Sequence, residues 1–224
     1  MTATVLDSRI FRDIFTTAEM RETFSDENRT ACYLEIETAL ACVQARLKII
    51  PQEAADEIVR KCRIENIDFD RLKAQTERIG YPLLGVVQQI VALCDKGLGE
   101  WAHWGATTQD ITDTAAVMQI RAALGHVEAD MEAIAATLAD LARRHRDTPM
   151  AGRSNLQQAL PLTFGYKCAT LLAAMQRHRQ RLKELRPRVL VGEFAGGVGT
   201  LASLGKDGLK VQAALMDELK LGQP

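Results

Sequence analysis

The segment 101–115, WAHWGATTQDITDTA, gathers side-chain types that can bind a small anion and move a proton. Thr107 can cap the helix that follows while Asp110 reaches back to the cap amide, which is the spacing of a capping box. The free N–H groups of a first helical turn, together with its dipole, attract a carboxylate or a phosphate. Thr108 and Gln109 can add side-chain donors, and His103 can add a cation or a proton.

The same segment has a second interpretation that involves no chemistry. Capping boxes are common at the start of helices, and a histidine just upstream can simply be buried by the fold. The sequence therefore leaves two possibilities, an anion-binding helix start or a plain helix cap. The tight grouping of His, Thr-Thr, Gln and Asp before a long helix favours the anion site.

A second polar cluster occupies 152–165, GRSNLQQALPLTFG. We expect a loop that leads into a helix from Pro161 to Pro187, because proline suits the first turn of a helix. A loop that only caps this helix is the alternative, but adjacent hydrogen-bonding side chains favour a binding site. The polar side chains concerned are those of Arg153, Ser154, Asn155, Gln157, Gln158 and Thr163.

Helical periodicity runs through most of the chain and must position both clusters. Apolar residues from Tyr33 to Leu47 recur at spacings of three and four after a capping serine, Ser25. A proline-free stretch from 108 to 146 predicts a helix of roughly 55 Å, which must pack against other helices. Further helices are expected at 52–62, from Asp68 to Gly80, at 83–96 (with a strand as the alternative) and at 206–220.

Composition agrees with a helical protein, because alanine and leucine are plentiful while only 5% of the residues are aromatic. We therefore predict an all-α fold. An N-terminal helical domain at 1–111 would be followed at 112–224 by the first part of a long-helix bundle. Two long helices have few packing partners within one chain, so oligomerisation or a truncated polypeptide is expected.

Two other stretches suggest different functions. Residues 197–202, GVGTLA, fit the G-x-G-x-x-A outline of a dinucleotide-binding turn, with Asp217 downstream. No strand–helix alternation surrounds them, so a structural loop is favoured. The basic run 177–188, RHRQRLKELRPR, lacks the interleaved aromatic residues that stack on bases. It is typical of the solvated, positive end of a helix.

The bulk properties argue against several classes of protein. A net charge of −1 provides no general attraction for nucleic acid or membranes, and no apolar run approaches the roughly 20 residues of a membrane span. No signal peptide is expected. The cysteines and the remaining histidines lack metal-ligand spacing, which predicts reduced thiols, a cytoplasmic protein and no metal. These residues are Cys32, Cys42, Cys62, Cys94, Cys168, His126, His145 and His178.

Four segments resemble the fumarase/aspartase lyase superfamily. HWGATTQDITDTA is similar to the HxGATSQDxxDTA motif of adenylosuccinate lyases and 3-carboxy-cis,cis-muconate cycloisomerases, with Thr108 where many members have serine. GRSNLQQALPLTFG resembles the second motif, GRTHxQxAxPxTxG. Residues 24–51 resemble the opening of cycloisomerase-like members, and GGVGTLASLG resembles a loop near their active site.

The resemblance implies an enzyme that acts on a small polycarboxylate by β-elimination or addition, with no cofactor. His103 would be a substrate-contacting or acid/base residue. The donors that stabilise an aci-carboxylate would be Thr107, Thr108, Gln109, Asn155 and Gln157, and the wider substrate-binding set adds Asp110, Arg153, Ser154 and Thr163.

Asn155 stands where the second motif usually has a histidine, and an amide cannot titrate. This departure favours the cycloisomerase branch over an adenylosuccinate lyase-like enzyme, which remains the alternative. The third motif, GSSxMPxKxNP with its serine base, is absent from the 224 residues. The resemblance thus covers only the first half of a family subunit.

A full-length family member forms a homotetramer in which each active site joins motifs from three chains. By this resemblance, residues 1–224 alone are expected to be inactive. An alternative from another class is a catalytically silent helical scaffold, which the missing motif and Asn155 would both fit.

Overall fold

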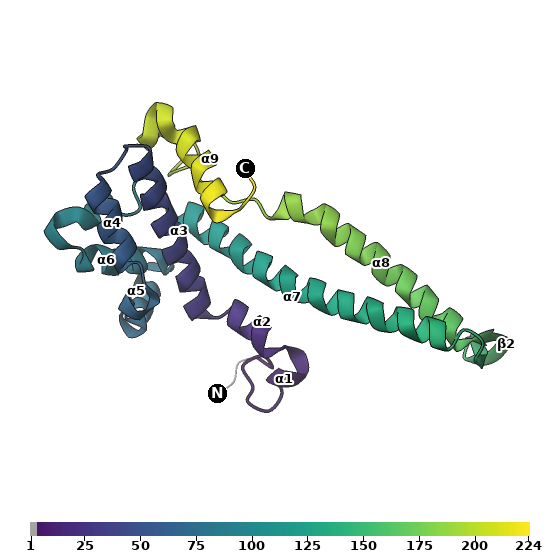
Figure 1. Cartoon of the computed structure of the whole chain (residues 1–224). Coiled ribbons are helices and arrows are strands. Elements are labelled where there is room, and N and C mark those ends of the chain that lie inside the picture. The colour runs from purple at the N-terminus through teal and green to yellow at the C-terminus, as the bar shows by residue number, and fades with distance from the viewer. Residues whose placement is uncertain (1–3) are drawn as a thin grey trace. The chain divides into compact units, whose positions relative to one another are not determined.

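Helices dominate residues 4–224, the part of the chain that the computed structural model describes (Figure 1). The only named strands in this part form one β-hairpin. The prediction of an all-α fold is confirmed. The α-helices and strands are α1 Arg12–Phe15, α2 Ala18–Thr23, α3 Asp26–Arg46, α4 Gln52–Lys61, α5 Phe69–Ile79, α6 Leu83–Leu93, α7 Thr108–Arg144, β1 Pro149–Ser154, β2 Gln157–Thr163, α8 Phe164–Val189 and α9 Gly208–Leu219. Short 3-10 turns are η1 Ile64–Asn66, η2 Asp95–Trp101 and η3 Ala202–Asp207.

The contacts divide the chain into two compact units, and each is described by itself. The first unit consists of Met1–Ala122 and Val189–Pro224, and the second consists of Ala123–Arg188. Helix α7 begins in the first unit and continues in the second. The division expected from the sequence, a helical domain at 1–111 and the first part of a long-helix bundle at 112–224, stays a prediction.

Several helix ends form as the sequence predicts. The hydroxyl of Ser25 accepts a hydrogen bond from the amide of Asn28 and caps α3, at 3.1 Å. Asp68 caps α5 in the same way through the amide of Arg71, at 3.0 Å. Gly80 ends α5 with a left-handed φ of 98°, a conformation that costs glycine little.

The core of the first unit joins residues that are far apart in the sequence. Ile36 of α3, Ile111 of α7, Phe194 after α8 and Leu215 of α9 are fully buried in one cluster. The segment that follows α8 therefore completes the core around α3 and the start of α7. This packing fixes the first turn of α7 against the rest of the unit.

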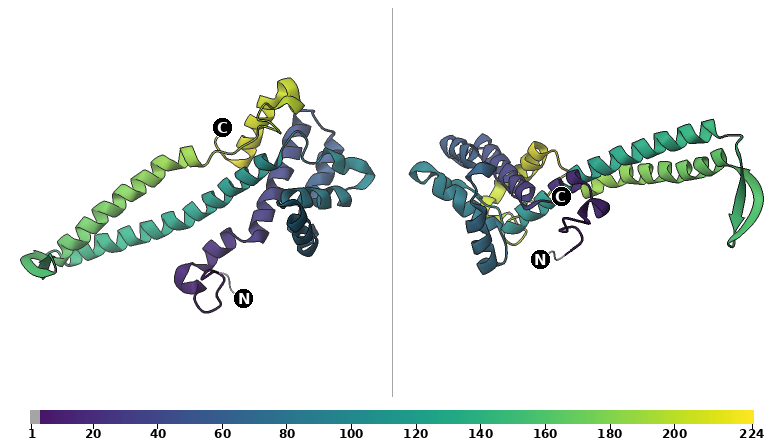
Figure 2. Two further views of the ribbon diagram at one scale, coloured as in Figure 1. Left: turned by 180° about the vertical axis from the view of Figure 1, so that it is seen from behind. Right: turned by 90° about the horizontal axis from the view of Figure 1, so that it is seen from below.

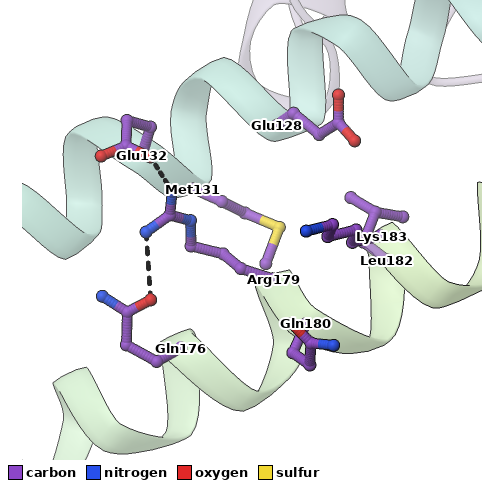
Figure 3. A pocket seen from close by; sticks show the side chains of 8 residues that line it. All are labelled: Glu128, Met131, Glu132, Gln176, Arg179, Gln180, Leu182 and Lys183. Atoms are coloured by element: carbon purple, nitrogen blue, oxygen red, sulfur yellow. Dashed lines mark hydrogen bonds and ion pairs between the residues drawn. The ribbon is translucent and has the colours of Figure 1, made fainter.

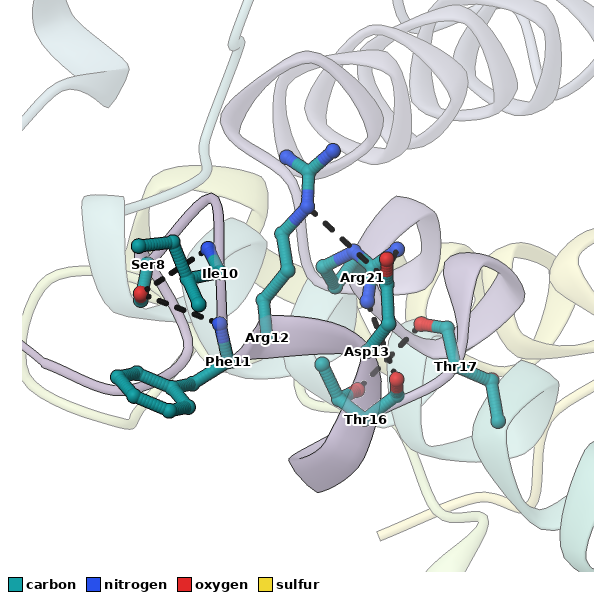
Figure 4. A network of polar contacts seen from close by, with 8 residues as sticks. All are labelled: Ser8, Ile10, Phe11, Arg12, Asp13, Thr16, Thr17 and Arg21. Carbon is teal, nitrogen blue, oxygen red and sulfur yellow. Dashed lines mark hydrogen bonds and ion pairs between the residues drawn. The ribbon is translucent and has the colours of Figure 1, made fainter.

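Polar contacts connect the short helices α1 and α2 near the N-terminus (Figure 4). Arg21 forms an ion pair with Asp13 at 2.7 Å and also donates to the carbonyl of Thr16 at 3.1 Å. Thr17 caps α2 by accepting from the amide of Met20, at 3.2 Å. These contacts set the turn between the two helices.

In the second unit, α8 runs antiparallel to the continuing part of α7 (Figures 1 and 2). Glu128 pairs with Arg186 at 2.8 Å, and Glu132 pairs with Arg179. Figure 3 shows Arg179 between Glu132 and Gln176 at a cavity of about 470 Å³. Two arginines of the basic run thus bind acids of α7, which supports its interpretation as a helix face.

The β-hairpin corrects the prediction that a helix begins at Pro161. Asn155 and Leu156 have φ of 49° and 64°, the backbone of a two-residue hairpin turn, for which asparagine is well suited. Pro161 lies in β2 opposite Ala151, in a two-stranded sheet where a proline can lie on an edge. Helix α8 starts at Phe164 instead, because the Thr163 hydroxyl accepts from the amide of Tyr166 at 3.1 Å. It also continues through Pro187 to Val189.

No helix within residues 4–224 combines the length and apolar character that a membrane crossing requires.

Candidate active site

Glu37 of α3 holds His103 on the loop that enters α7. The ring Nδ1 of His103 lies 2.6 Å from Glu37 Oε1, and the backbone amide of His103 donates to Glu37 Oε2 at 3.1 Å. Because an ionised carboxylate can only accept, Nδ1 carries the proton in this pair. The second ring nitrogen, Nε2, has no hydrogen-bond partner within residues 4–224.

The surroundings of His103 favour its charged form. Burial lowers the pKa of the imidazole, but the hydrogen bond and the charge of Glu37, with a further contribution from Asp110, outweigh burial and raise the pKa. The Glu37 side chain is only 4% exposed, so its charge acts in a medium that screens it poorly. His103 also has a left-handed φ of 59°, which a non-glycine residue adopts only when its surroundings hold it.

Gln44, a second residue of α3, also contacts the loop that carries His103. Its Nε2 donates to the carbonyl of Trp104 at 2.7 Å, and the side chain is completely buried. Glu37 and Gln44 are seven residues apart and therefore lie on one face of the helix. Together they fix the backbone of residues 103 and 104 against α3.

Asp110 organises the start of α7. Its Oδ2 accepts from the amides of Thr107 at 2.8 Å and Gly196 at 3.1 Å, and its Oδ1 accepts from the amide of Ala195 at 2.7 Å. The hydrogen bond from the Thr107 amide to Asp110, which the capping box predicts, is therefore present. Asp110 is 1% exposed, and three backbone donors already occupy its carboxylate. Its carboxylate therefore positions the helix start, and the direct substrate contact expected from the sequence stays a prediction.

Thr114, one turn further along α7, connects the helix to the same returning segment. Its hydroxyl donates to the carbonyl of Glu193 at 2.9 Å and accepts from the amide of Glu193 at 2.8 Å. Thr114 and Asp110 thus join α7 to residues 193–196 through four hydrogen bonds.

Replacing Thr114 with valine is expected to lower the free energy of unfolding by about 1–3 kcal/mol. Valine keeps the shape but leaves the amide and carbonyl of Glu193 without partners at a position that is 0% exposed. Urea denaturation of the two proteins measures the loss. Thr137→Val, on an exposed turn of the same helix, should change stability by less than about 0.5 kcal/mol. Equal effects of the two substitutions would contradict the importance of this contact.

The other candidates of the first cluster lie on the first turn of α7 and its approach. Thr107 and Thr108 are half-buried, whereas Gln109 is exposed and donates to Asp113 at 2.6 Å. Nearby, burial and then a hydrogen bond to Asp113 raise the pKa of the Glu193 carboxyl, and the charges of Asp113 and Asp110 add to the effect. A proton is therefore easier to retain on Glu193 than on an ordinary glutamate.

The second cluster belongs to the other compact unit. Arg153, Ser154, Asn155 and Gln157 are exposed on the β-hairpin, and within residues 4–224 their side chains form no hydrogen bond or ion pair. Thr163 is half-buried and caps α8. Asn155, which replaces the family histidine, lies in the turn itself. The side chains of Arg153, Ser154, Asn155 and Gln157 are therefore open to solvent in this unit, and their role in binding substrate stays a prediction.

The glycine-rich stretch 192–205 has no dinucleotide-binding architecture. Val191 forms only an isolated bridge with Gly222, and no strand of the described residues leads into the stretch. Its backbone amides at 195 and 196 instead bind Asp110. Gly196 has φ of 76°, which glycine adopts without strain. The interpretation as a structural loop beside the start of α7 is supported.

Glu37 is the residue of the candidate site that the sequence analysis did not identify. It stands four residues after Tyr33 and three before Leu40, on the apolar stripe that the periodicity predicts to be buried. A carboxylate on such a stripe needs a partner, since an unpaired buried charge is costly. A charged residue on a stripe that is otherwise apolar could therefore have indicated a buried ion pair. The sequence does not identify the partner, His103, which lies 66 residues away.

Within residues 4–224 no group of three or more His, Cys, Asp or Glu side chains is placed to hold one metal ion. The five cysteines are free; Cys32 and Cys168 are buried, and the others are partly exposed.

Comparison with known proteins decides the family. A profile of the lyase family matches residues 14–224. The chain belongs to this lyase family. It is 58% identical over 209 residues to trans-aconitate decarboxylase 1 of Mycosarcoma maydis, a match that covers 93% of the chain and 42% of the relative. It is 44% identical over 220 residues to 3-carboxy-cis,cis-muconate cycloisomerase of Pseudomonas aeruginosa, covering 97% and 48% respectively.

Among solved structures, fumarate lyase from Mesorhizobium sp. BNC1 is similar to this member of the lyase family, with a TM-score of 0.90 and 52% identity. The match covers 94% of this chain and 49% of that one. The chain therefore spans about half the length of the relatives it matches. The resemblance to the fumarase/aspartase superfamily, over its N-terminal half, is confirmed.

Proposed function

We propose that the complete protein is an enzyme that forms or breaks a bond next to a carboxylate of a small unsaturated polycarboxylate. The names of its relatives refer to trans-aconitate, carboxymuconate and fumarate, which are all unsaturated acids with two or more carboxylates. A cycloisomerase-like addition to a double bond is the reaction that the sequence motifs favour. Decarboxylation is a second candidate, which the 58% identity to trans-aconitate decarboxylase 1 supports.

The observation that carries this proposal is the grouping of His103 with the first turn of α7. Glu37 fixes the imidazole, and Asp110 fixes the helix start that follows it. The unpaired N–H groups and the positive end of a long helix stabilise a carboxylate. Thr107, Thr108 and Gln109 supply further donors there, so the substrate would be held through a carboxylate beside the imidazole.

The remaining parts of the site are proposed to come from other copies of the chain in a homotetramer. Arg153, Ser154, Asn155 and Gln157 are exposed and have no partner within the described residues, which supports a role across an interface. Thr163 would hold the start of α8 beneath them. Asn155 would donate to a developing negative charge but would not transfer a proton, because an amide does not titrate. The general base would lie outside residues 1–224. The five free cysteines support a cytoplasmic location.

The test is turnover by the complete protein and by residues 1–224 alone. Ultraviolet absorbance follows the double bonds of trans-aconitate and 3-carboxymuconate and the fumarate that adenylosuccinate would release, and released carbon dioxide reports decarboxylation. The complete protein should turn over one unsaturated polycarboxylate, and residues 1–224 should turn over none. Turnover by the isolated segment would contradict a base outside it. A complete protein that is inactive with every candidate would support the silent scaffold instead.

The double substitution Thr108→Val with Gln109→Leu is expected to abolish calorimetrically detectable binding of succinate to the complete protein. Both changes remove donors at the start of α7, and each charge-assisted hydrogen bond is worth about 1.5–3 kcal/mol. Thr137→Val, far along α7 in the sequence, should leave the affinity unchanged. If the double variant binds succinate as the unmodified protein does, this segment serves only as a helix cap.

A further inference from the structure

Glu37 contacts His103 at two points, one on the ring and one on the backbone. Both oxygens of Glu37 are used: Oε1 meets the ring Nδ1 at 2.6 Å, and Oε2 accepts from the backbone amide of the same residue at 3.1 Å. Such a two-point contact fixes the position of the residue and the rotation of its ring together. The side chains are 4% and 21% exposed, so water replaces neither bond easily.

We propose that Glu37 is a positioning residue that keeps His103 protonated and orients its Nε2–H, so that His103 binds a substrate carboxylate and does not serve as the base. This inference rests on the proposed function, which supplies the carboxylate. An imidazolium donates from both nitrogens, so one can stay on Glu37 while the other meets the ligand. A neutral ring held in this way offers a lone pair at Nε2, which repels an anion.

The charged groups around the ring all act in the same direction. Glu37 approaches from α3 and Asp110 from α7, and both are acids that favour the imidazolium. Glu37 is the stronger of the two because it contacts the ring directly, whereas the carboxylate of Asp110 accepts from three backbone amides. Burial opposes them and does not prevail, so the pKa of His103 is raised. Affinity for a dicarboxylate should therefore fall as the pH rises through this raised pKa.

Gln44 makes the arrangement rigid. It holds the carbonyl of Trp104 at 2.7 Å, next to the strained backbone of His103. Two side chains of one helix thus fix consecutive residues of the loop. The imidazole is therefore oriented before a substrate arrives, and less conformational entropy is lost on binding.

The first experiment titrates the imidazole without substrate. The complete protein is labelled with ¹³C at the histidine rings, and His103 is assigned by the loss of its signal in His103→Gln. We expect its pKa to lie above the ordinary value of about 6.5 and to move down in Glu37→Gln. The matched control is Glu35→Gln, which removes the same charge from an exposed position of α3 and should leave the titration unchanged.

The second experiment separates binding from catalysis. With the substrate found for the complete protein, Glu37→Gln should raise KM about 10-fold at neutral pH while kcat changes less than about 3-fold, because a carboxylate anchor acts on ground and transition states alike. Glu35→Gln should change neither constant. A fall in kcat at unchanged KM would overturn the proposal, since His103 would then act in the chemical step.

The outcomes separate this inference from the proposed function. An unmodified protein in which the pKa of His103 is at or below the ordinary value overturns the inference even if the enzyme is active, and this measurement does not depend on a Glu37 variant that folds. An active enzyme in which Glu37→Gln leaves the titration unmoved overturns it as well. A raised pKa in a protein that neither binds nor converts any polycarboxylate instead overturns the proposed function, and the carboxylate role of His103 with it.

Discussion

Asp110→Ala is expected to lower the free energy of unfolding by about 3–5 kcal/mol, as judged from the cost of leaving several buried donors unsatisfied. The substitution removes the acceptor for the amides of Thr107, Ala195 and Gly196. These amides belong to two segments that are about 85 residues apart, so their connection is lost together with the helix cap. Urea denaturation followed by circular dichroism measures the difference in the free energy of unfolding.

Asp113→Ala is the matched control for this substitution. It removes the same side chain three residues further along α7, at an exposed position, and stability should change by less than about 0.5 kcal/mol. If Asp110→Ala were as mild as Asp113→Ala, the three bonds of Asp110 would not carry the connection between α7 and the glycine-rich loop. Binding of succinate should weaken in Asp110→Ala.

Phe194→Ala should destabilise the protein by about 3–5 kcal/mol, the range for removing a fully buried aromatic ring. Phe194 is 0% exposed and lies in the cluster that joins α3, the start of α7 and α9. The cavity would open beneath residues 195 and 196, whose amides hold Asp110. Thermal unfolding monitored at 222 nm should show a lower midpoint, and hydrogen exchange should be faster at the start of α7.

The control lies in the same segment. Val198 is 85% exposed, and its truncation to alanine should shift stability by less than about 0.5 kcal/mol. A loss for Phe194→Ala no larger than that for Val198→Ala would mean that the segment after α8 does not complete the core of the first unit.

Local signals explain why most helices could be predicted. The start of α3 depends on a serine and the end of α5 on a glycine, and both act over a single turn. The start of α7 likewise follows from Thr107 to Asp110, which are contiguous in the sequence. Such features need no knowledge of distant partners, so the sequence was sufficient for them.

The β-hairpin could not be predicted from the same kind of signal. Proline at 161 is compatible with a helix start and with an edge strand, and the choice depends on the pairing of β1 with β2. The two-residue turn consists of Asn155 and Leu156. Leu156 has a φ of 64°, and leucine is not a residue type from which such a turn is predicted. The pairing of β1 with β2 therefore determines that Pro161 lies in a strand and not at the start of a helix.

The candidate site was predicted as a list of residues but not as an arrangement. His103 and Asp110 were identified from their types and spacing, whereas the partners that fix them, Glu37 and Gly196, are 66 and 86 residues away. Spacing along one segment cannot reveal such contacts. For Asp110 the distant contacts add a positioning role at the glycine-rich loop that the sequence did not predict.

The first unit is built from two stretches of chain, with residues 123–188 between them, and this order matters during synthesis. Helix α3 leaves the ribosome well before Phe194 and α9, which later cover its apolar face. At about 5–20 residues per second, roughly 10–35 s pass between the two events. During that interval the nascent chain exposes the surface of an unfinished core, and a holding chaperone would find its binding site there.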